Sequence, residues 1–119
     1  MLSCVGPTAP SDGRVCTAQV VPGIVVEIRA KASAQPLAYW AQGVVREGAY
    51  SDSLEPYGFL NLDPQSMVSR QAAYERAGIY SVEVTASGFQ TVKFEGVTVL
   101  SGPCHVQTAN LTALLEPAP

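Results

Sequence analysis

The single histidine is the first residue whose side chain could do chemistry. His105 is the only imidazole among the 119 residues of the chain. A catalytic histidine needs a nucleophile and an orienting acid beside it, yet the sequence contains no Gly-x-Ser-x-Gly elbow or similar signature. Metal binding by histidine usually needs further His or Cys ligands at short spacing, and these are also absent. We therefore expect His105 to be a structural polar residue near the end of a strand.

Acidic side chains form the second group that could act as ligands or catalysts. Four of them fall in one third of the chain, namely Glu47, Asp52, Glu55 and Asp63. A calcium-binding loop places oxygen ligands at close, alternating spacing, and these four do not follow such a pattern. We interpret them as solvated loop acids. The sequence therefore predicts no catalytic residue, no metal ligand, no cofactor and no enzymatic activity.

Aromatic side chains indicate binding rather than catalysis. Residues 37–46 follow an extended pattern whose core face holds Leu37, Tyr39, Ala41 and Val45. Trp40 then points outward. Together with Tyr57 and Phe59 of the following connection, Trp40 could form an exposed patch that binds a glycan or a partner protein. In the alternative interpretation, the connection folds over the sheet and covers Trp40. We favour this alternative, because monomers rarely leave apolar patches open.

The chain has an odd number of cysteines: Cys4, Cys16 and Cys104. Cys16 lies just before the first strand-like segment and Cys104 at the start of the last one. The two ends of a β-sandwich can lie side by side, so the sequence predicts a Cys16–Cys104 disulfide and an unpaired Cys4. The alternative is three free thiols in a cytosolic protein.

The segment around Cys4 resembles the end of a bacterial lipobox. Residues 1–4 read Met-Leu-Ser-Cys, as if an export signal had been removed before them, and residues 5–13 are small, polar and rich in proline. This resemblance implies lipidation of Cys4 and an exported lipoprotein, periplasmic, outer-membrane or extracellular. The alternative is a plain free cysteine in a frayed terminus. We expect a flexible tether over residues 1–15 and one β-sandwich domain over residues 16–116.

Composition excludes several classes of partner. The net charge is −3, and the seven basic residues are scattered along the chain. A nucleic-acid-binding protein would carry a basic stripe, and a protein that binds anionic lipid a polybasic patch. No run of about 18 apolar residues is present. We therefore expect no nucleic-acid partner, and membrane contact only through a lipid at Cys4.

Short alternating segments between Gly and Pro residues indicate the fold class. Residues 24–29 and 80–86 alternate apolar and polar side chains with a period of two, which is typical of half-buried strands. The sequence predicts an all-β, Greek-key sandwich of about seven strands. The parity of the last segment changes between Val106 and Ala109, which predicts a bulge. Residues 66–76 allow either a short helix capped at Asp63 or a strand entering a hairpin at residues 77–78.

Several of these segments together resemble the carboxypeptidase regulatory-like (prealbumin- or transthyretin-like) β-sandwich family. The most characteristic is Gly-x-Tyr-x-Val-x-Val at residues 78–84, followed by Gly-Phe at residues 88–89; further matches lie at residues 22–29, 44–50 and 104–106. The resemblance extends from Val21 to Leu115 and departs from the family at residues 31–34. Its motifs are structural, so it implies the fold rather than an activity.

A non-catalytic role follows from these observations. We expect a structural or binding module of the bacterial cell envelope whose partner is a protein or a glycan. One alternative is an accessory domain that assists a hydrolase, as the family name suggests. A further alternative is a small hydrolase with an unrecognised site. The transthyretin-like hydrolases use several histidines and a Tyr-Arg-Gly-Ser tail, whereas this chain has one histidine and ends Glu-Pro-Ala-Pro.

Overall fold

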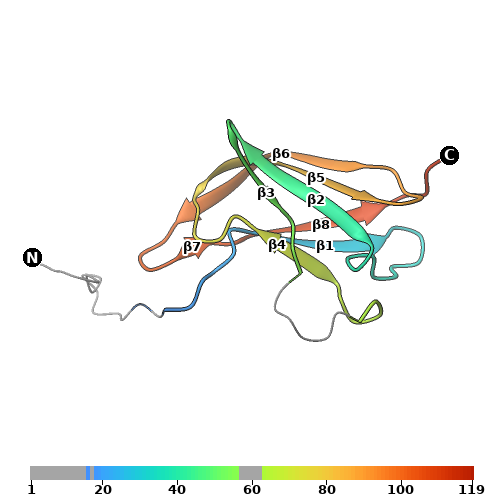
Figure 1. The fold of residues 1–119 in the computed structure, drawn as a ribbon, viewed down its shortest axis with the longest axis horizontal. Coiled ribbons are helices and arrows are strands. Elements are labelled where there is room, and N and C mark those ends of the chain that lie inside the picture. The colour runs from blue at the N-terminus through green and yellow to red at the C-terminus, as the bar shows by residue number, and fades with distance from the viewer. Residues whose placement is uncertain (1–15, 17, 57–62) are drawn as a thin grey trace, which may run out of the picture.

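Two β-sheets pack face to face in the computed structural model, which describes residue 16 and residues 18–56 and 63–119. The strands are β1 (Ile24–Ala30), β2 (Ala41–Glu47), β3 (Tyr50–Ser53), β4 (Ser69–Ala72), β5 (Gly78–Ala86), β6 (Val92–Ser101), β7 (Val106–Gln107) and β8 (Ala109–Leu115). One sheet has the order β4-β1-β8 and the other β3-β2-β5-β6-β7 (Figure 1). The predicted all-β sandwich is confirmed, with eight strands described rather than about seven.

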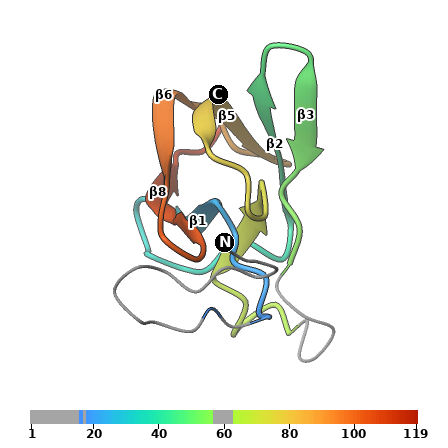
Figure 2. The ribbon, with the colours of Figure 1, turned by 90° about the vertical axis from the view of Figure 1, so that its left-hand side faces the viewer.

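The alternating side chains of β1 and β5 build the core between the sheets. On β1 the buried positions are Ile24, Val26, Ile28 and Ala30, and on β5 they are Tyr80, Val82 and Val84. Each strand is central in its sheet, so its β-branched side chains are packed against neighbours on both sides. The view along the sandwich shows β1 in one layer and β5 in the other (Figure 2). Burial of these faces is the main stabilising contribution to the fold.

The change of parity near the C-terminus has a different cause from the predicted bulge. β7 pairs with β6 in the five-stranded sheet, whereas β8 pairs in parallel with β1 in the other sheet. Thr108 lies between them, and its hydroxyl donates a hydrogen bond of 2.7 Å to the Pro22 carbonyl. The chain therefore changes sheets at Thr108. A bulge is present instead in β6, where Gly96 adopts a φ of 66° at a shift of the β5–β6 register.

Residues 66–76 contain a strand, as one of the two sequence interpretations had it, but neither a helix nor the expected hairpin. Asp63 begins a single turn, because its carbonyl accepts hydrogen bonds from the amides of Ser66 and Met67 at 3.1 and 3.0 Å. The strand that follows, β4, pairs with β1 and forms no hairpin with β5. β4 and β5 therefore belong to different sheets, and residues 73–77 carry the chain from one to the other.

A tyrosine corner fixes this crossing. The Tyr80 hydroxyl donates to the Arg76 carbonyl at 2.7 Å and accepts a hydrogen bond from the Arg76 guanidinium at 2.9 Å. That guanidinium also lies 3.7 Å from the ring centre of Tyr50. Glu47 accepts hydrogen bonds of 2.8 Å from Arg76 and from the amide of Ile79. The interpretation of Glu47 as a solvated loop acid is therefore wrong, because both of its oxygens have protein partners.

The predicted disulfide is present. Cys16 and Cys104 are bonded, with 5.2 Å between their Cα atoms and 88 residues between them in the sequence. The bond ties the segment before β1 to the loop before β7. Cys4 and the predicted tether of residues 1–15 lie outside the described residues.

Removal of the disulfide should strongly destabilise the protein. Loss of a cross-link that closes a loop of about 88 residues corresponds to about 4.5 kcal/mol of denatured-state entropy in the chain-entropy model. We expect the Cys16→Ser/Cys104→Ser variant to unfold in urea with a free energy about 4 kcal/mol below that of the oxidised wild type. Cys4→Ser is the control and should match the wild type. Equal stability of the double variant would contradict this assignment.

Acid should weaken the tyrosine corner. The Ile79 amide and the Arg76 guanidinium, against a smaller effect of burial, hold the pKa of Glu47 below its usual value. A lowered folded-state pKa gives stability that is present above the unfolded-state value of about 4.3 and is lost as the pH falls through the folded-state value. Glu47→Gln should therefore be less stable at neutral pH and lose stability less steeply on acidification, as measured by urea unfolding. Parallel pH profiles for the two proteins would refute this role of Glu47.

Candidate binding surface at the aromatic turn

Tyr39 and Trp40 lie in a tight turn between β1 and β2, and not in a strand. The amides of Trp40 and Ala41 both donate to the Leu37 carbonyl, at 3.1 and 3.0 Å. Leu37 and Ala38 are buried beneath the turn, whereas Tyr39 is 41% exposed and Trp40 is 48% exposed. The prediction that Tyr39 faces the core is therefore wrong, because the turn rotates it outward. We call residues 37–40 the aromatic turn.

The two aromatic rings of this turn contact each other at the surface. Their centres are 5.4 Å apart and their planes are nearly perpendicular, the edge-to-face arrangement that aromatic pairs favour. Such a pair presents a ring face together with the polar phenol and indole groups. Large exposed aromatic side chains are typical of binding surfaces, because they bring much contact area and lose little conformational entropy.

Arg70 of β4 fixes the backbone of the aromatic turn. Its Nε donates to the Ala38 carbonyl at 2.7 Å, and its two terminal nitrogens donate to the carbonyls of Leu54 and Tyr39 at 3.0 and 3.4 Å. Arg70 is opposite Val26 in the β1–β4 register, so its side chain extends from the inner face of its sheet. The guanidinium thus joins the three-stranded sheet to the turn before β2 and to the residue that follows β3.

The charge of Arg70 is half buried. Burial lowers the pKa of the guanidinium, and the negative charge of Glu55 partly opposes this effect. Within the described residues Arg70 forms no ion pair within 4 Å of a carboxylate; its bonds go to backbone carbonyls. The sequence offered no signal for this role, because the partner atoms belong to the backbone.

Arg70 also lines a hollow of about 340 Å³. Its lining residues come from β2, the end of β3 and β4, and they are Gln42, Gly43, Ser53, Leu54, Glu55 and Arg70. Gly43 permits the close packing at its base, since a Cβ there would lie 2.3 Å from Cδ1 of Leu54. Glu55 is fixed by two reciprocal backbone hydrogen bonds of 2.8 Å with Gln71. Residues 37–40 do not line the hollow, but Arg70 connects it to the aromatic turn, because the same side chain lines the hollow and donates to the Tyr39 carbonyl.

The other predicted site residues are dispersed. Tyr57 and Phe59 lie outside the described residues. Asp52 accepts a hydrogen bond of 3.0 Å from the Ala73 amide, so Asp52 is not merely solvated. Of the acids in the middle of the chain, only Glu55 lines the hollow.

His105 joins a polar cluster near the disulfide. Its Nδ1 lies 2.5 Å from Oε2 of Glu75. The same oxygen accepts a hydrogen bond of 2.9 Å from the Val21 amide, and the other carboxylate oxygen accepts one of 3.3 Å from the Val106 amide. Glu75 therefore connects the segment before β1 to β7. None of these contacts involves a residue of the aromatic turn.

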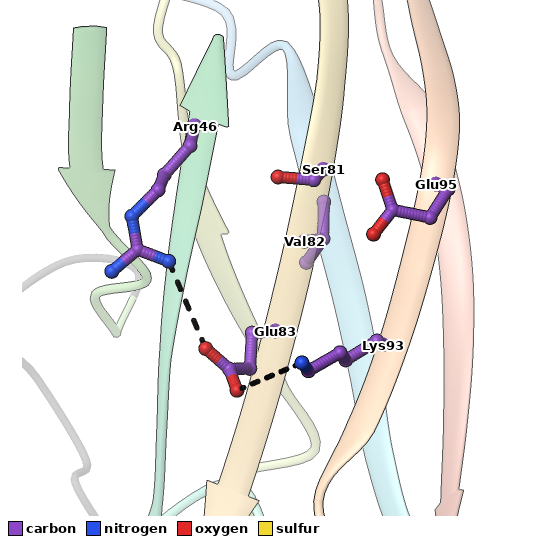
Figure 3. Close-up of a pocket in the computed structure, with 6 residues that line it drawn as sticks. All are labelled: Arg46, Ser81, Val82, Glu83, Lys93 and Glu95. Carbon is purple, nitrogen blue, oxygen red and sulfur yellow. Dashed lines mark ion pairs between the residues drawn. The ribbon is translucent and has the colours of Figure 1, made fainter. Parts of the chain in front are cut away.

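A row of charges on the outer face of the five-stranded sheet forms a second surface feature (Figure 3). Glu83 lies between Arg46 and Lys93, at 3.7 and 4.0 Å, and a shallow hollow of about 80 Å³ adjoins them. Exposed ion pairs of this length contribute little to stability or to specific binding. The row has the character of a solvated sheet face, and the aromatic turn is the stronger candidate.

No protein-family model matches the chain, and no curated protein sequence matches it either. The residues that the structure describes contain no cluster of three or more His, Cys, Asp or Glu side chains that could hold a metal. Across the same residues, no helix has the length and apolar character needed to cross a membrane.

Loss of the Arg70 guanidinium should destabilise the sandwich. Arg70→Met keeps the aliphatic volume and leaves three backbone carbonyls without a donor, so we expect a decrease of about 2 kcal/mol or more in the free energy of unfolding. Arg70→Lys should rescue this loss only partly, because an ammonium cannot reproduce the planar fork. The matched control is Arg46→Met on the outer sheet face, expected within about 0.5 kcal/mol of wild type. This role would be excluded if urea unfolding gave Arg46→Met a free energy of unfolding equal to or lower than that of Arg70→Met.

Proposed function

We propose that the protein is a non-catalytic binding module of the bacterial cell envelope and that the aromatic turn is its contact surface. The observation that carries this proposal is the pair of exposed aromatic rings on a turn whose backbone is fixed by Arg70. Aromatic residues exposed on a rigid support lose little freedom when they bind, so more of the contact energy appears as affinity. Trp and Tyr are also the residues that most often dominate binding energies.

Location outside the cytoplasm is part of the proposal. A disulfide that closes most of the domain is typical of proteins in oxidising compartments and rare in cytosolic ones. The lipobox-like residues before Cys4 support an envelope lipoprotein, in which an acyl chain at Cys4 would hold the sandwich near a membrane. The aromatic turn would then meet ligands at the cell surface or in the periplasm.

Binding to envelope material should depend on Trp40. We expect the protein to co-sediment with washed bacterial envelopes, and Trp40→Ala to weaken this binding at least tenfold, as for a residue at the centre of a contact. Trp40 is half exposed, so the same change should lower the free energy of unfolding by less than about 1 kcal/mol, against 3 or more for a buried aromatic residue.

The control for this experiment is Leu114→Ala. Leu114 is 47% exposed, close to Trp40 in exposure, and lies on β8 of the other sheet. It should bind envelopes like the wild type. Equal binding of Trp40→Ala and wild type, or absence of envelope binding by the wild type, would overturn the proposed function.

A further inference from the structure

We infer that the aromatic turn and the adjoining hollow bind a neutral saccharide, with a sugar ring stacked on Trp40 and its hydroxyl groups hydrogen-bonded in the hollow. This inference rests on the proposed function and narrows its ligand to one chemical class. It uses only described residues: the aromatic turn and the lining of the hollow.

The two parts of the surface match the two faces of a sugar. A pyranose ring has an apolar C–H face, which gains dispersion energy against an aromatic ring, and a periphery of hydroxyl groups. The residues that line the hollow include four with polar side chains: the amide of Gln42, the hydroxyl of Ser53, the carboxylate of Glu55 and the guanidinium of Arg70. These groups include both donors and acceptors, which a hydroxyl group requires because it is itself both. An apolar ligand would leave all of them unpaired.

Arg70 still has donors to offer. A guanidinium carries five N–H groups, and the backbone carbonyls accept from only some of them. The same side chain therefore fixes the aromatic turn and presents hydrogen-bond donors to the hollow. Its position is set by the fold before a ligand arrives, which reduces the loss of entropy on binding.

Size and charge restrict the saccharide further. A hollow of about 340 Å³ is at the small end of ligand pockets, so it suits one or two sugar rings of a longer chain. Glu55 and Arg70 contribute one negative and one positive charge, so the lining has no net charge. The whole chain carries a net charge of −3. An acidic saccharide would thus gain little from Arg70 and be repelled by the molecule, whereas a neutral one meets no such penalty.

Titration with defined trisaccharides tests the inference. The probes are neutral trimers of glucose, mannose, galactose and N-acetylglucosamine, and an acidic trimer of galacturonic acid. Trp40 is the only tryptophan, so its fluorescence reports stacking directly, and calorimetry gives the affinity independently. We expect at least one neutral trimer to bind saturably and to shift the emission to the blue, and the acidic trimer to bind more weakly than that trimer.

Variants of the hollow separate specific binding from general stickiness. Gln42→Ala and Glu55→Gln should each weaken binding of the neutral trimer roughly three- to tenfold, the value of a typical hydrogen bond. The matched controls are Gln107→Ala and Glu95→Gln, exposed residues of β7 and β6 outside the hollow, and both should bind like the wild type. Equal effects of the hollow and control variants would overturn the inference.

The envelope experiment distinguishes failure of the inference from failure of the proposed function. If envelope binding depends on Trp40 but no neutral trimer binds or competes at millimolar concentration, the saccharide inference is wrong and the binding module stands. Tighter binding of the acidic trimer than of every neutral trimer would also refute the inference. If envelope binding does not depend on Trp40, both proposals fall together.

Discussion

The half-buried guanidinium of Arg70 fixes the backbone of the aromatic turn, the segment that exposes Tyr39 and Trp40. Removing a positive charge from water is unfavourable, and here three backbone carbonyls from outside the strands, those of Ala38, Tyr39 and Leu54, offset that penalty. The carbonyls belong to the aromatic turn and to the end of β3, two segments far apart in the sequence. Their separation from β4 is therefore fixed by one planar group. An inward-facing charge on the short edge strand β4 also discourages pairing with another chain.

The remaining constraints lie elsewhere in the fold and leave the aromatic turn accessible. The tyrosine corner around Tyr80 fixes the crossing from β4 to β5, and the disulfide joins the segment before β1 to the loop before β7. With the core of β1 and β5 they form a rigid support. Binding residues of β-proteins commonly lie on loops that such a support positions. The proposed saccharide surface follows this arrangement, since the turn supplies ring faces and the strands supply hydrogen-bonding groups.

The sequence predicted those features that depend on local alternation or on covalent chemistry. The buried positions of β1 and β5 follow from a period of two, and the Cys16–Cys104 pair follows from the placement of its members at the ends of one sandwich. Alternation failed where the chain leaves a strand. Strand parity predicted an outward-facing Trp40; its ring is half exposed, but because of a turn, and Tyr39 is exposed with it. The favoured interpretation, in which the connection covers Trp40, concerns residues outside the described ones. The parity change before Ala109 was recognised, but its cause is a change of sheet.

The role of Arg70 could not have been predicted, for a physical reason. Its partners are backbone carbonyls, which every residue has, so their sequence neighbourhood carries no distinctive side chain. The contacts of Glu47, with the Arg76 guanidinium and the Ile79 amide, likewise depend on how β2 and β5 pair. Interactions that join distant backbone atoms appear only once the fold is known.

The most direct test of the proposed binding surface is nuclear magnetic resonance of the protein during a titration with the neutral trisaccharide that binds it. The single indole N–H of Trp40, the side-chain amide of Gln42 and the Nε–H of Arg70 give separate signals in nitrogen-labelled protein. Binding at the aromatic turn predicts that all three shift together along one saturation curve, while the backbone amides of Lys93 and Glu95 on β6 remain unchanged. Shifts confined to the outer sheet face, with the Trp40 indole signal unmoved, would contradict it.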